Sequence, residues 1–517
     1  MTQLNTIGEH FAEHLAYARS VEAYRTQQHE TEPKVNVVGA GGVITAAFEQ
    51  LRKAAENTEE HLLFQSAIRR FFKRSFITRD RNLIDKSGDE LAIELTLAGY
   101  TANDSLTKAQ VAEITDLSQQ YYGAYEQVLN NRQASGDKAL HWTLDVLSAR
   151  VEAILTDHSL DDAFVDTASE YLTELVSARD REAQDFGARL LVAIYYTLLK
   201  SNDAIIRATL LSRYGVTPDN YDHYVSFNKM IDKLLDSKPV DKLTRFVDRQ
   251  GAPLRVLRRM MYDQPQIDKL LESRDRFLEA YEQQVNKEYE RINTRLNRAI
   301  LRSVVFLVIT KFVIGIAMEV PYDMWVYGEI HWPALIINLL FPPVYMLLLR
   351  STLTLPSYAN TTALVDRASA MLYGGSEQIV SARVRERRYS STFNFIYTVS
   401  ALAIFSLVTW LLLQIGFSWV HIVVFFLFFS AASFLGFRLS RLVRELEVVR
   451  EKQNGFTFLR DLIYLPFVVL GQWMNEKYSK INVVTTLLDM VIELPLKTVL
   501  RLVRQWNAFI DDRKDSI

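Results

Sequence analysis

The sequence contains no cysteine, and this absence excludes several kinds of chemistry. Without cysteine the chain forms no disulfide, offers no thiol nucleophile and provides no thiolate metal ligand. A surplus of positive charge is also missing, because 59 Lys and Arg stand against 61 Asp and Glu. A nucleic-acid-binding protein would present a strongly basic face, so the composition gives no indication of nucleic acid as a partner.

The start of the chain lacks the apolar core of a signal peptide, since Met1–Arg25 is polar and interrupted by Glu9, His10, Glu13 and His14. We therefore expect the first long apolar segment to act as the insertion signal. Long apolar runs are absent from the first 300 residues, in which acidic side chains slightly outnumber basic ones. Basic side chains predominate after residue 300, where nearly all continuous apolar stretches occur. This division indicates a soluble first part and a membrane-embedded second part.

Four apolar segments of the second part qualify as membrane spans, because a helix needs about 20 residues to cross the hydrocarbon core. They cover residues 303–320, 332–349, 393–413 and 417–437. The second contains Pro342 and Pro343, which lack amide hydrogens, so we expect it to kink near the middle of the membrane.

Positive charge alternates between the segments that connect the spans. Basic side chains precede the first span, occupy the segment between the second and third, and follow the fourth. The other two connections contain no Lys or Arg. By the positive-inside rule, this alternation predicts that both termini lie in the cytoplasm. Buried helices of a soluble protein would not produce it.

The chain is predicted to be all-α, with a helical cytoplasmic N-terminal domain and a four-helix transmembrane domain. Residues 1–42 are expected to form an N-terminal segment and linker, and residues 43–265 the helical domain, with a subdivision near residue 135 as an alternative. No series of alternating strands occurs, so an α/β enzyme core is not expected.

Residues 266–302 are predicted to form a stalk that continues into the first span. Apolar residues follow each other at helical intervals without Pro or Gly, which predicts one helix from residue 267 to residue 318, about 75 Å long. Two interpretations are open, a connector that packs against its own domain and a coiled coil between subunits.

After the fourth span, residues 438–517 are expected to form amphipathic or interfacial helices on the cytoplasmic side. Leu462–Met474 is apolar but too short to cross, which favours an interfacial or re-entrant segment. Residues 481–506 have one charged and one apolar face. We favour the inner leaflet as their binding surface over the cytoplasmic domain.

Three motifs imitate functional sites. Val35–Ile44 imitates a dinucleotide-binding loop, but Ile44 stands where the third glycine belongs and no βαβ pattern follows. His10–His14 matches the zinc-protease pattern H-x-x-E-H without an identifiable third ligand. The acidic group at residues 157–162 fits no calcium loop. We therefore predict no catalytic residue, no cofactor and no metal.

Lys311 lies near the middle of the first span, where a charge costs at least about 2.5–3.5 kcal/mol. It can snorkel to the inner surface, pair within the bundle, or line a polar path beside Pro342 and Pro343. Its candidate partners in the bundle are Glu319, Tyr397, Ser400 and Ser406. We favour snorkelling or pairing, because Glu319 is the one further Asp, Glu, Lys or Arg expected within the spans and a relay needs more.

The stretches Glu59–Leu63, Ala67–Arg74 and Ile309–Asp323 cover a small part of the chain. They resemble an uncharacterised family of multi-span bacterial membrane proteins with a helical cytoplasmic domain. The resemblance implies a bacterial plasma-membrane location. It assigns no activity and no functional residue.

The sequence favours a non-enzymatic membrane scaffold or interaction protein, in which the helical domain binds a protein partner and the spans anchor it in the lipid bilayer. Polar side chains are scarce in the spans, and more than half of the chain is predicted to be cytoplasmic. The alternative is an ion channel or small-solute transporter that uses Lys311 and the kink at Pro342 and Pro343. Four helices make a thin bundle for a pore, so a homo-oligomer is expected in that case. An enzyme acting on lipid is a third hypothesis, supported by location alone.

Overall fold

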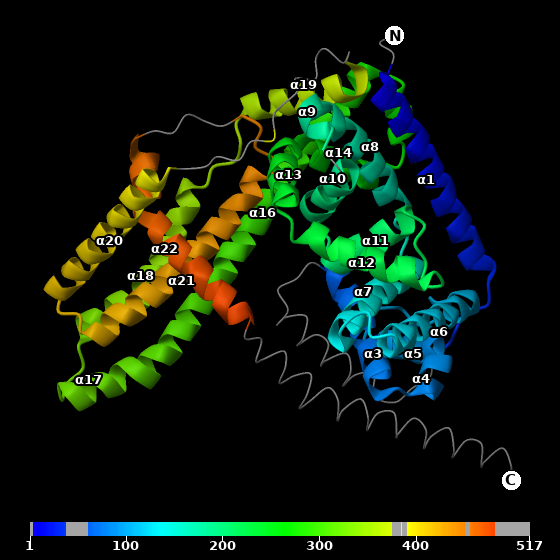
Figure 1. Cartoon of the computed structure of the whole chain (residues 1–517). Helices are drawn as coiled ribbons and strands as arrows, with labels where there is room; N and C mark the ends of the chain where they lie inside the picture. The colour runs from blue at the N-terminus through cyan, green and yellow to red at the C-terminus, as the bar shows by residue number, and fades with distance from the viewer. Residues whose placement is uncertain are drawn as a thin grey trace. The chain divides into compact units, whose positions relative to one another are not determined.

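The computed structural model describes residues 4–37, 60–183, 185–374, 384, 390–449 and 455–480 (Figure 1). These residues form helices and turns, without a strand, and one isolated bridge joins Lys34 to Thr107. The all-α prediction is confirmed. The chain divides into two compact units, which we call the N-terminal unit, mainly residues 4–248, and the membrane unit, mainly residues 249–374 and 390–480.

The N-terminal unit is built from short and medium helices. They are α1 (Thr6–Thr31), α3 (Glu60–Thr78), α4 (Arg81–Asp85), α5 (Ser87–Leu97), α6 (Lys108–Asn130), α7 (Gly136–Leu155), α8 (Ser159–Leu175), α9 (Ala178–Arg181), α10 (Phe186–Ile194), the π-helical turn η1 (Tyr195–Leu199), α11 (Asp203–Arg213), α12 (Tyr221–Leu235) and most of α13 (Lys238–Gln250).

Helix α7 lies at the centre of this unit. The side chain of Ser135 caps its start by accepting a hydrogen bond from the Lys138 amide, at the turn that the sequence indicates. The helix then buries Trp142 and Val146 among α3, α6 and α11. Because helices from both sides of residue 135 pack on α7, the turn there joins them into one unit.

Helix α1 packs on α8 and buries Phe11 and Leu15 completely. The predicted N-terminal segment and linker, residues 1–42, therefore contains a helix of the N-terminal unit. Helix α3 is the first described helix of the predicted domain over residues 43–265, whose residues 43–59 lie outside the described ones.

The membrane unit contains the long apolar helices. Its elements are α14 (Ala252–Asp263), α15 (Ile267–Leu271), α16 (Arg274–Ile314), the π-helical turn η2 (Gly315–Glu319), α17 (Val320–Val326), α18 (Trp332–Thr352), α19 (Tyr358–Tyr373), α20 (Ser391–Gln414), α21 (Trp419–Arg444) and α22 (Gly455–Lys480). Among the described residues, four helices are long and apolar enough to cross a membrane: α16 continued through α17, and α18, α20 and α21. The four predicted spans are confirmed in the length and apolar composition of their helices.

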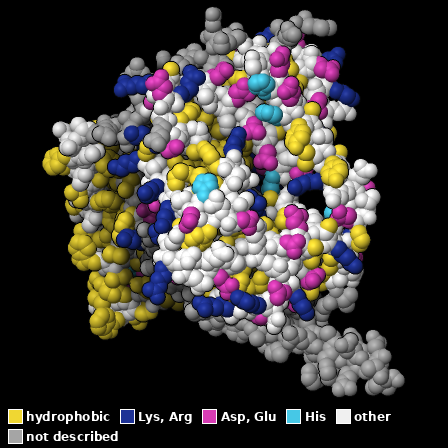
Figure 2. All heavy atoms as spheres, turned by 45° about the vertical axis from the view of Figure 1, so that its right-hand side comes forward, with side chains coloured by type: hydrophobic (Ala, Val, Ile, Leu, Met, Phe, Trp, Pro, Cys, Tyr) yellow, Lys and Arg dark blue, Asp and Glu magenta, His cyan; other side chains and the backbone are white. Residues whose placement is uncertain are grey.

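The surfaces of the two units differ in kind (Figure 2). On the N-terminal unit, Lys, Arg, Asp and Glu side chains are interspersed, whereas hydrophobic side chains gather on the apolar helices. Phe395 on α20, for example, is 70% exposed. An apolar surface of this extent is stable when lipid covers it.

The predicted stalk differs from the structure at both ends. Helix α15 ends at Leu271, and α16 begins at Arg274 after Ser273, which has an extended backbone. At the other end the helix does not stop at residue 318 but continues through η2 and α17 to Val326. Pro321 permits this continuation because a proline in the first turn of a helical segment needs no hydrogen-bond acceptor.

One asparagine side chain ties three segments of the membrane unit together. Asn360 of α19 donates hydrogen bonds to the Tyr289 hydroxyl of α16, at 2.9 Å, and to the Leu446 carbonyl just after α21, at 2.8 Å. Its oxygen accepts from the amides of Val448 and Val449 at 2.6 and 2.9 Å. Asn360 is fully buried. We call this arrangement the Asn360 clamp.

Helix α22 is longer than the apolar piece Leu462–Met474 from which it was predicted. It spans 26 residues with Pro466 inside and packs along α21 and α20. Phe467 is buried between their rings, with its centroid 4.2 Å from that of Phe429 and 4.9 Å from that of Phe405. The interfacial or re-entrant position of this helix stays a prediction, and the predicted amphipathic helix over residues 481–506 lies outside the described residues.

Gly471 lies where α22 packs closely against α21. A Cβ at this position would overlap the carbonyl group of Ser430 and the side chain of Phe434. We expect Gly471→Leu to lower the stability of the protein by about 1–3 kcal/mol through overpacking, measured as thermal unfolding in detergent micelles.

Gly123→Ala is the matched control, because Gly123 lies within α6 with open space around it. Alanine is the better helix former, so this change should keep or raise the unfolding temperature. Equal behaviour of the two variants would contradict the close contact between α21 and α22.

Candidate functional site

Four buried residues follow one another at intervals of four along the first apolar helix. They are Lys311, Gly315, Glu319 and Asp323. Residues four apart share a helix face, and most neighbouring side chains are exposed and apolar. The helix therefore turns an apolar surface outward and a charged stripe toward α18 and α21.

Lys311 and Glu319 form an ion pair inside the bundle. Lys311 Nζ lies 2.7 Å from Glu319 Oε1, and both side chains are 1% exposed. Gly315, which lies between them on the same face, has no side chain to separate them. Of the explanations considered for Lys311, the observed arrangement is pairing with Glu319. Its ammonium also lies 4.8 Å from the centre of the Phe428 ring.

The π-helical turn η2 carries the glutamate of this pair. Turns of this kind are rare and are found frequently at functional sites. Pro321 follows directly and cannot donate a hydrogen bond into the preceding turn, which accounts for a break in the α-helical pattern here. The widened turn sets the position of Glu319 relative to Lys311.

Asn338 of α18 links the ion pair to α21. Its side-chain nitrogen donates to Glu319 Oε1 at 3.0 Å and to the carbonyl oxygen of His421 at 3.1 Å. Pro342 and Pro343 lie one turn further along α18 and are buried. Because neither proline has an N–H, the carbonyl groups one turn earlier, including that of Asn338, lose their helical donors. The prolines thus add backbone polarity beside the network.

His421 and Asp323 extend the network toward the beginning of α21. His421 Nε2 lies 3.5 Å from Asp323 Oδ2, and both side chains are fully buried. The other ring nitrogen of His421 lies 2.8 Å from the hydroxyl of Ser418, which caps α21. Asp323 also accepts a hydrogen bond from the backbone N–H of His331 at 3.0 Å. The imidazole of His331 is 34% exposed, so the network reaches the surface there.

Several polar atoms of this network make no hydrogen bond to the residues that the structure describes. They are Glu319 Oε2, Asp323 Oδ1, Asn338 Oδ1 and His421 Nε2. Buried polar atoms in native proteins are nearly always paired, so this cluster has capacity for a further donor or charge. Across the described ranges, no group of three His, Asp or Glu side chains is arranged to hold a metal.

The network lies in one half of the bundle beside buried apolar side chains such as Phe417, Ile422 and Phe425. Beyond Lys311, a buried cluster includes Leu307, Met346, Phe428 and Ala432. At the far end the Arg350 guanidinium donates to Asn297 and Asn293 of α16, each at 2.7 Å. The basic residues thus mark one end of the bundle and Asp323 the other.

Asp323 falls in the connection between the first two predicted spans, 303–320 and 332–349. In the structure it lies in α17 and is fully buried. Asn338 and His421 were not singled out. The signal available for Asp323 was its spacing of four from Glu319 and eight from Gly315. Polar residues that follow the end of a span usually lie in a loop, so the sequence alone does not distinguish Asp323 from a loop residue.

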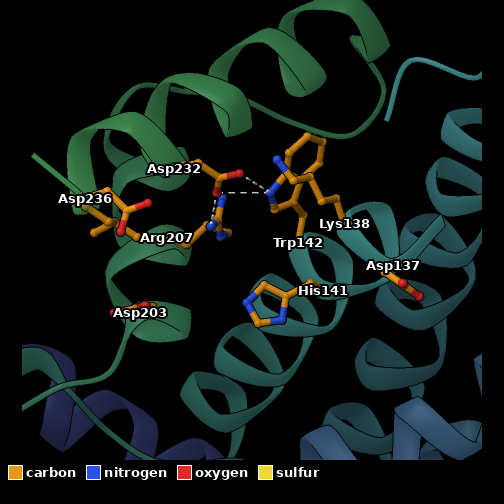
Figure 3. A pocket seen from close by; sticks show the side chains of 9 residues that line it. Asp137, Lys138, His141, Trp142, Asp203, Arg207, Asp232 and Asp236 are labelled. Atoms are coloured by element: carbon orange, nitrogen blue, oxygen red, sulfur yellow. Dashed lines mark hydrogen bonds and ion pairs between the residues drawn. The ribbon is translucent and has the colours of Figure 1, made fainter. Parts of the chain in front are cut away.

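A second polar site lies in the N-terminal unit, in a pocket of about 470 Å³ (Figure 3). Its lining residues are Asp137, Lys138, His141, Trp142, Asp203, Arg207, Leu235, Asp232 and Asp236. The buried guanidinium of Arg207 lies 2.6 Å from Asp232 and 3.5 Å from Asp145, and Asp232 also accepts from the Trp142 indole. These pairs connect α7, α11 and α12, which is a structural role.

The three motifs singled out in the sequence have ordinary surroundings where they are described. His10 pairs with Glu170 of α8 at 2.9 Å. Asp157 accepts the Ser159 amide at the start of α8, and burial raises the pKa of Asp162. The glycines of Val35–Ile44 lie outside the described residues.

The Arg207 pairs generate a prediction for stability. Arg207→Ala removes the guanidinium that pairs with Asp232 at 2.6 Å, while Asp145 keeps its ion pair with Arg69 at 2.9 Å. We expect this change to cost about 1–3 kcal/mol. The matched control is Arg213→Ala on the same helix, whose pair with Asp166 is exposed and contributes less than about 1 kcal/mol. Amide hydrogen exchange of α7 and α11 in the full-length protein measures both. A loss as small for Arg207 as for Arg213 would contradict the buried network.

The ion pair of the membrane unit generates a second prediction. Lys311→Met strands the Glu319 charge and should destabilise the protein by about 3–5 kcal/mol, whereas adding Glu319→Gln should restore most of this loss. Detergent-induced unfolding in mixed micelles measures the stability of the wild type, the two single variants and the double variant. Additive effects of the two substitutions would show that these side chains are not paired.

Comparison with protein-family models, with curated proteins and with solved structures gave no match for this chain. The resemblance to a bacterial membrane-protein family therefore stays a prediction. The candidate site rests on its own geometry, a buried chain of charged and polar side chains that connects three membrane helices.

Proposed function

We propose that the protein is a membrane transport protein in which the network from Lys311 to Asp323 lies on the path of a small cation or solute. One observation carries this proposal: the buried Lys311–Glu319 pair is joined through polar side chains to the partly exposed His331. Ionisable groups inside spans are rare and commonly mark ion or substrate pathways.

The energetic cost of the network supports a functional role. Desolvating two charges costs several kcal/mol per ion even after relaxation, and apolar side chains often hold helices together equally well. Here two carboxylates, a lysine, a histidine and an asparagine are buried within three helices. A bundle selected for anchoring alone has no need of these groups.

The distribution of polar and apolar side chains favours a transporter over an open channel. The polar network reaches the surface at His331, while Leu307, Met346 and Phe428 fill the half beyond Lys311. A path that is polar from one end and closed from the other is the arrangement expected of one state in alternating access.

The orientation that we propose follows the positive-inside rule. The basic residues at the start of α16, at Arg350 and at the end of α21 would face the cytoplasm, together with both termini. The Asp323 end of the network would then face the outside of the plasma membrane.

The function is tested by flux through proteoliposomes that contain the purified full-length protein. We expect the double variant Lys311→Met/Glu319→Gln to lower the flux of protons and alkali cations at least about tenfold, because it removes both charges. Entrapped fluorescent indicators measure the rates.

Thr310→Val is the matched control for this test. Thr310 neighbours Lys311, but its hydroxyl bonds to the Phe306 carbonyl of its own helix. This variant should retain wild-type flux. Equal rates in the double variant and the wild type would remove the main support for transport.

A second candidate function is a membrane-anchored interaction protein, favoured by the pocket of the N-terminal unit. The acidic side chains of Asp137, Asp203 and Asp236 line it around a rigid ion-paired floor, a setting suited to a basic side chain of a partner. Affinity capture with the full-length protein in nanodiscs that enriched no partner would count against this role.

A further inference from the structure

The charges of the membrane network do not balance when its groups have their usual ionisation. Lys311 and Glu319 neutralise one another at 2.7 Å. The remaining pair is Asp323 and His421, both fully buried. A carboxylate beside a neutral imidazole leaves one negative charge in a low-dielectric interior, which is costly. One bound positive charge would cancel it.

The arrangement of the ligands favours a proton over a metal ion as this charge. No group of three His, Asp or Glu side chains among the described residues could hold a metal, whereas a proton needs one donor and one acceptor. His421 Nε2 and Asp323 Oδ2 are 3.5 Å apart, and neither Nε2 nor Asp323 Oδ1 has a hydrogen-bond partner in the described part of the chain. A small approach of the two side chains makes a charge-assisted hydrogen bond.

Ser418 fits both protonation states of His421. Its hydroxyl lies 2.8 Å from His421 Nδ1. A hydroxyl can donate to the bare nitrogen of a neutral imidazole, and it can accept from the N–H of an imidazolium. The ring therefore keeps this partner whether or not it carries the additional proton. A site built for one fixed charge state has no need of such a partner.

The surroundings provide a route for the proton and a boundary to it. His331 lies with its Nδ1 3.8 Å from Asp323 Oδ2 and is partly exposed, so it can exchange protons with water. On the inner side, Asn338 separates His421 from Glu319 and Lys311. These are the charged and titratable groups that face the Asp323–His421 pair from α16, η2 and α18 in the described structure.

We infer that the Asp323–His421 pair binds one exchangeable proton, loaded through His331, and that this proton is the coupling or transported ion of the membrane unit. On loading, a hydronium ion gives its proton to the partly exposed imidazole of His331 and leaves as water. His331 then returns to its neutral form by passing a proton through the Asp323 carboxylate to His421, with no electron transferred. The assignment to transport rests on the function proposed above, whereas the binding of the proton does not.

Infrared difference spectroscopy of the full-length protein in nanodiscs tests the binding. The sample is titrated between about pH 5 and about pH 8, the range in which histidine usually changes charge. We expect the difference between wild type and His421→Gln to contain the signal of one titrating imidazole. The same difference taken in an Asp323→Asn background should lose that signal, because no carboxylate remains to stabilise the imidazolium.

His223→Gln is the matched control, since His223 lies on α12 of the N-terminal unit, away from any residue of the network in sequence and element. Its own imidazole signal should persist in the Asp323→Asn background. Three outcomes would overturn the inference: no titrating imidazole assigned to His421, a His421 signal unchanged by Asp323→Asn, or a response to sodium at constant pH instead of to acid.

The flux measurement separates this inference from the proposed function. Titration of His421 together with absent flux leaves the proton site in place and refutes transport. Flux that does not respond to a pH gradient, and that His421→Gln leaves unchanged, refutes the proton as coupling ion while transport stands.

Discussion

The membrane unit depends on one physical constraint, that a charge within hydrocarbon must be paired. Lys311 meets this constraint through Glu319, and the pair determines much of what surrounds it. The π-helical turn positions the glutamate, and Asn338 donates to the same carboxylate oxygen from α18. Helices that show apolar side chains to lipid are thus held together by polar contacts inside, where hydrophobic driving force is weak.

Both units bury charged side chains and pair them with opposite charges. In the N-terminal unit, Arg207 pairs with Asp232 and Asn228 of α12 and lies 3.5 Å from Asp145 of α7, and these contacts bind the helices into one core. In the membrane unit, carboxylate and imidazole atoms of Glu319, Asp323 and His421 still have capacity for a partner.

The helices and spans were predictable because their signals are local. Apolar length and alternating charge define the four spans, and Ser135 marks the start of α7. Glu319 could be predicted as one of several candidate partners of Lys311, since both residues lie in the same span. Asp323, Asn338 and His421 come from three helices, and their meeting depends on helix register, which no local pattern contains. Helix α22 extends beyond Leu462–Met474 at both ends, and its apolar stretch alone did not define its length.

The Asn360 clamp restricts how the chain can vary in length. It holds residues 446–449, just beyond α21, against Tyr289 of α16, while His421 meets Asp323 near the other end of the same two helices. Adding or removing one residue of α21 between these points would rotate one end against the other by about 100° and shift it by about 1.5 Å. The histidine would then leave the carboxylate. The number of residues between His421 and Leu446 is therefore fixed by the contacts at both ends. Substitutions on the lipid-facing side of this stretch are tolerated, whereas insertions and deletions are not.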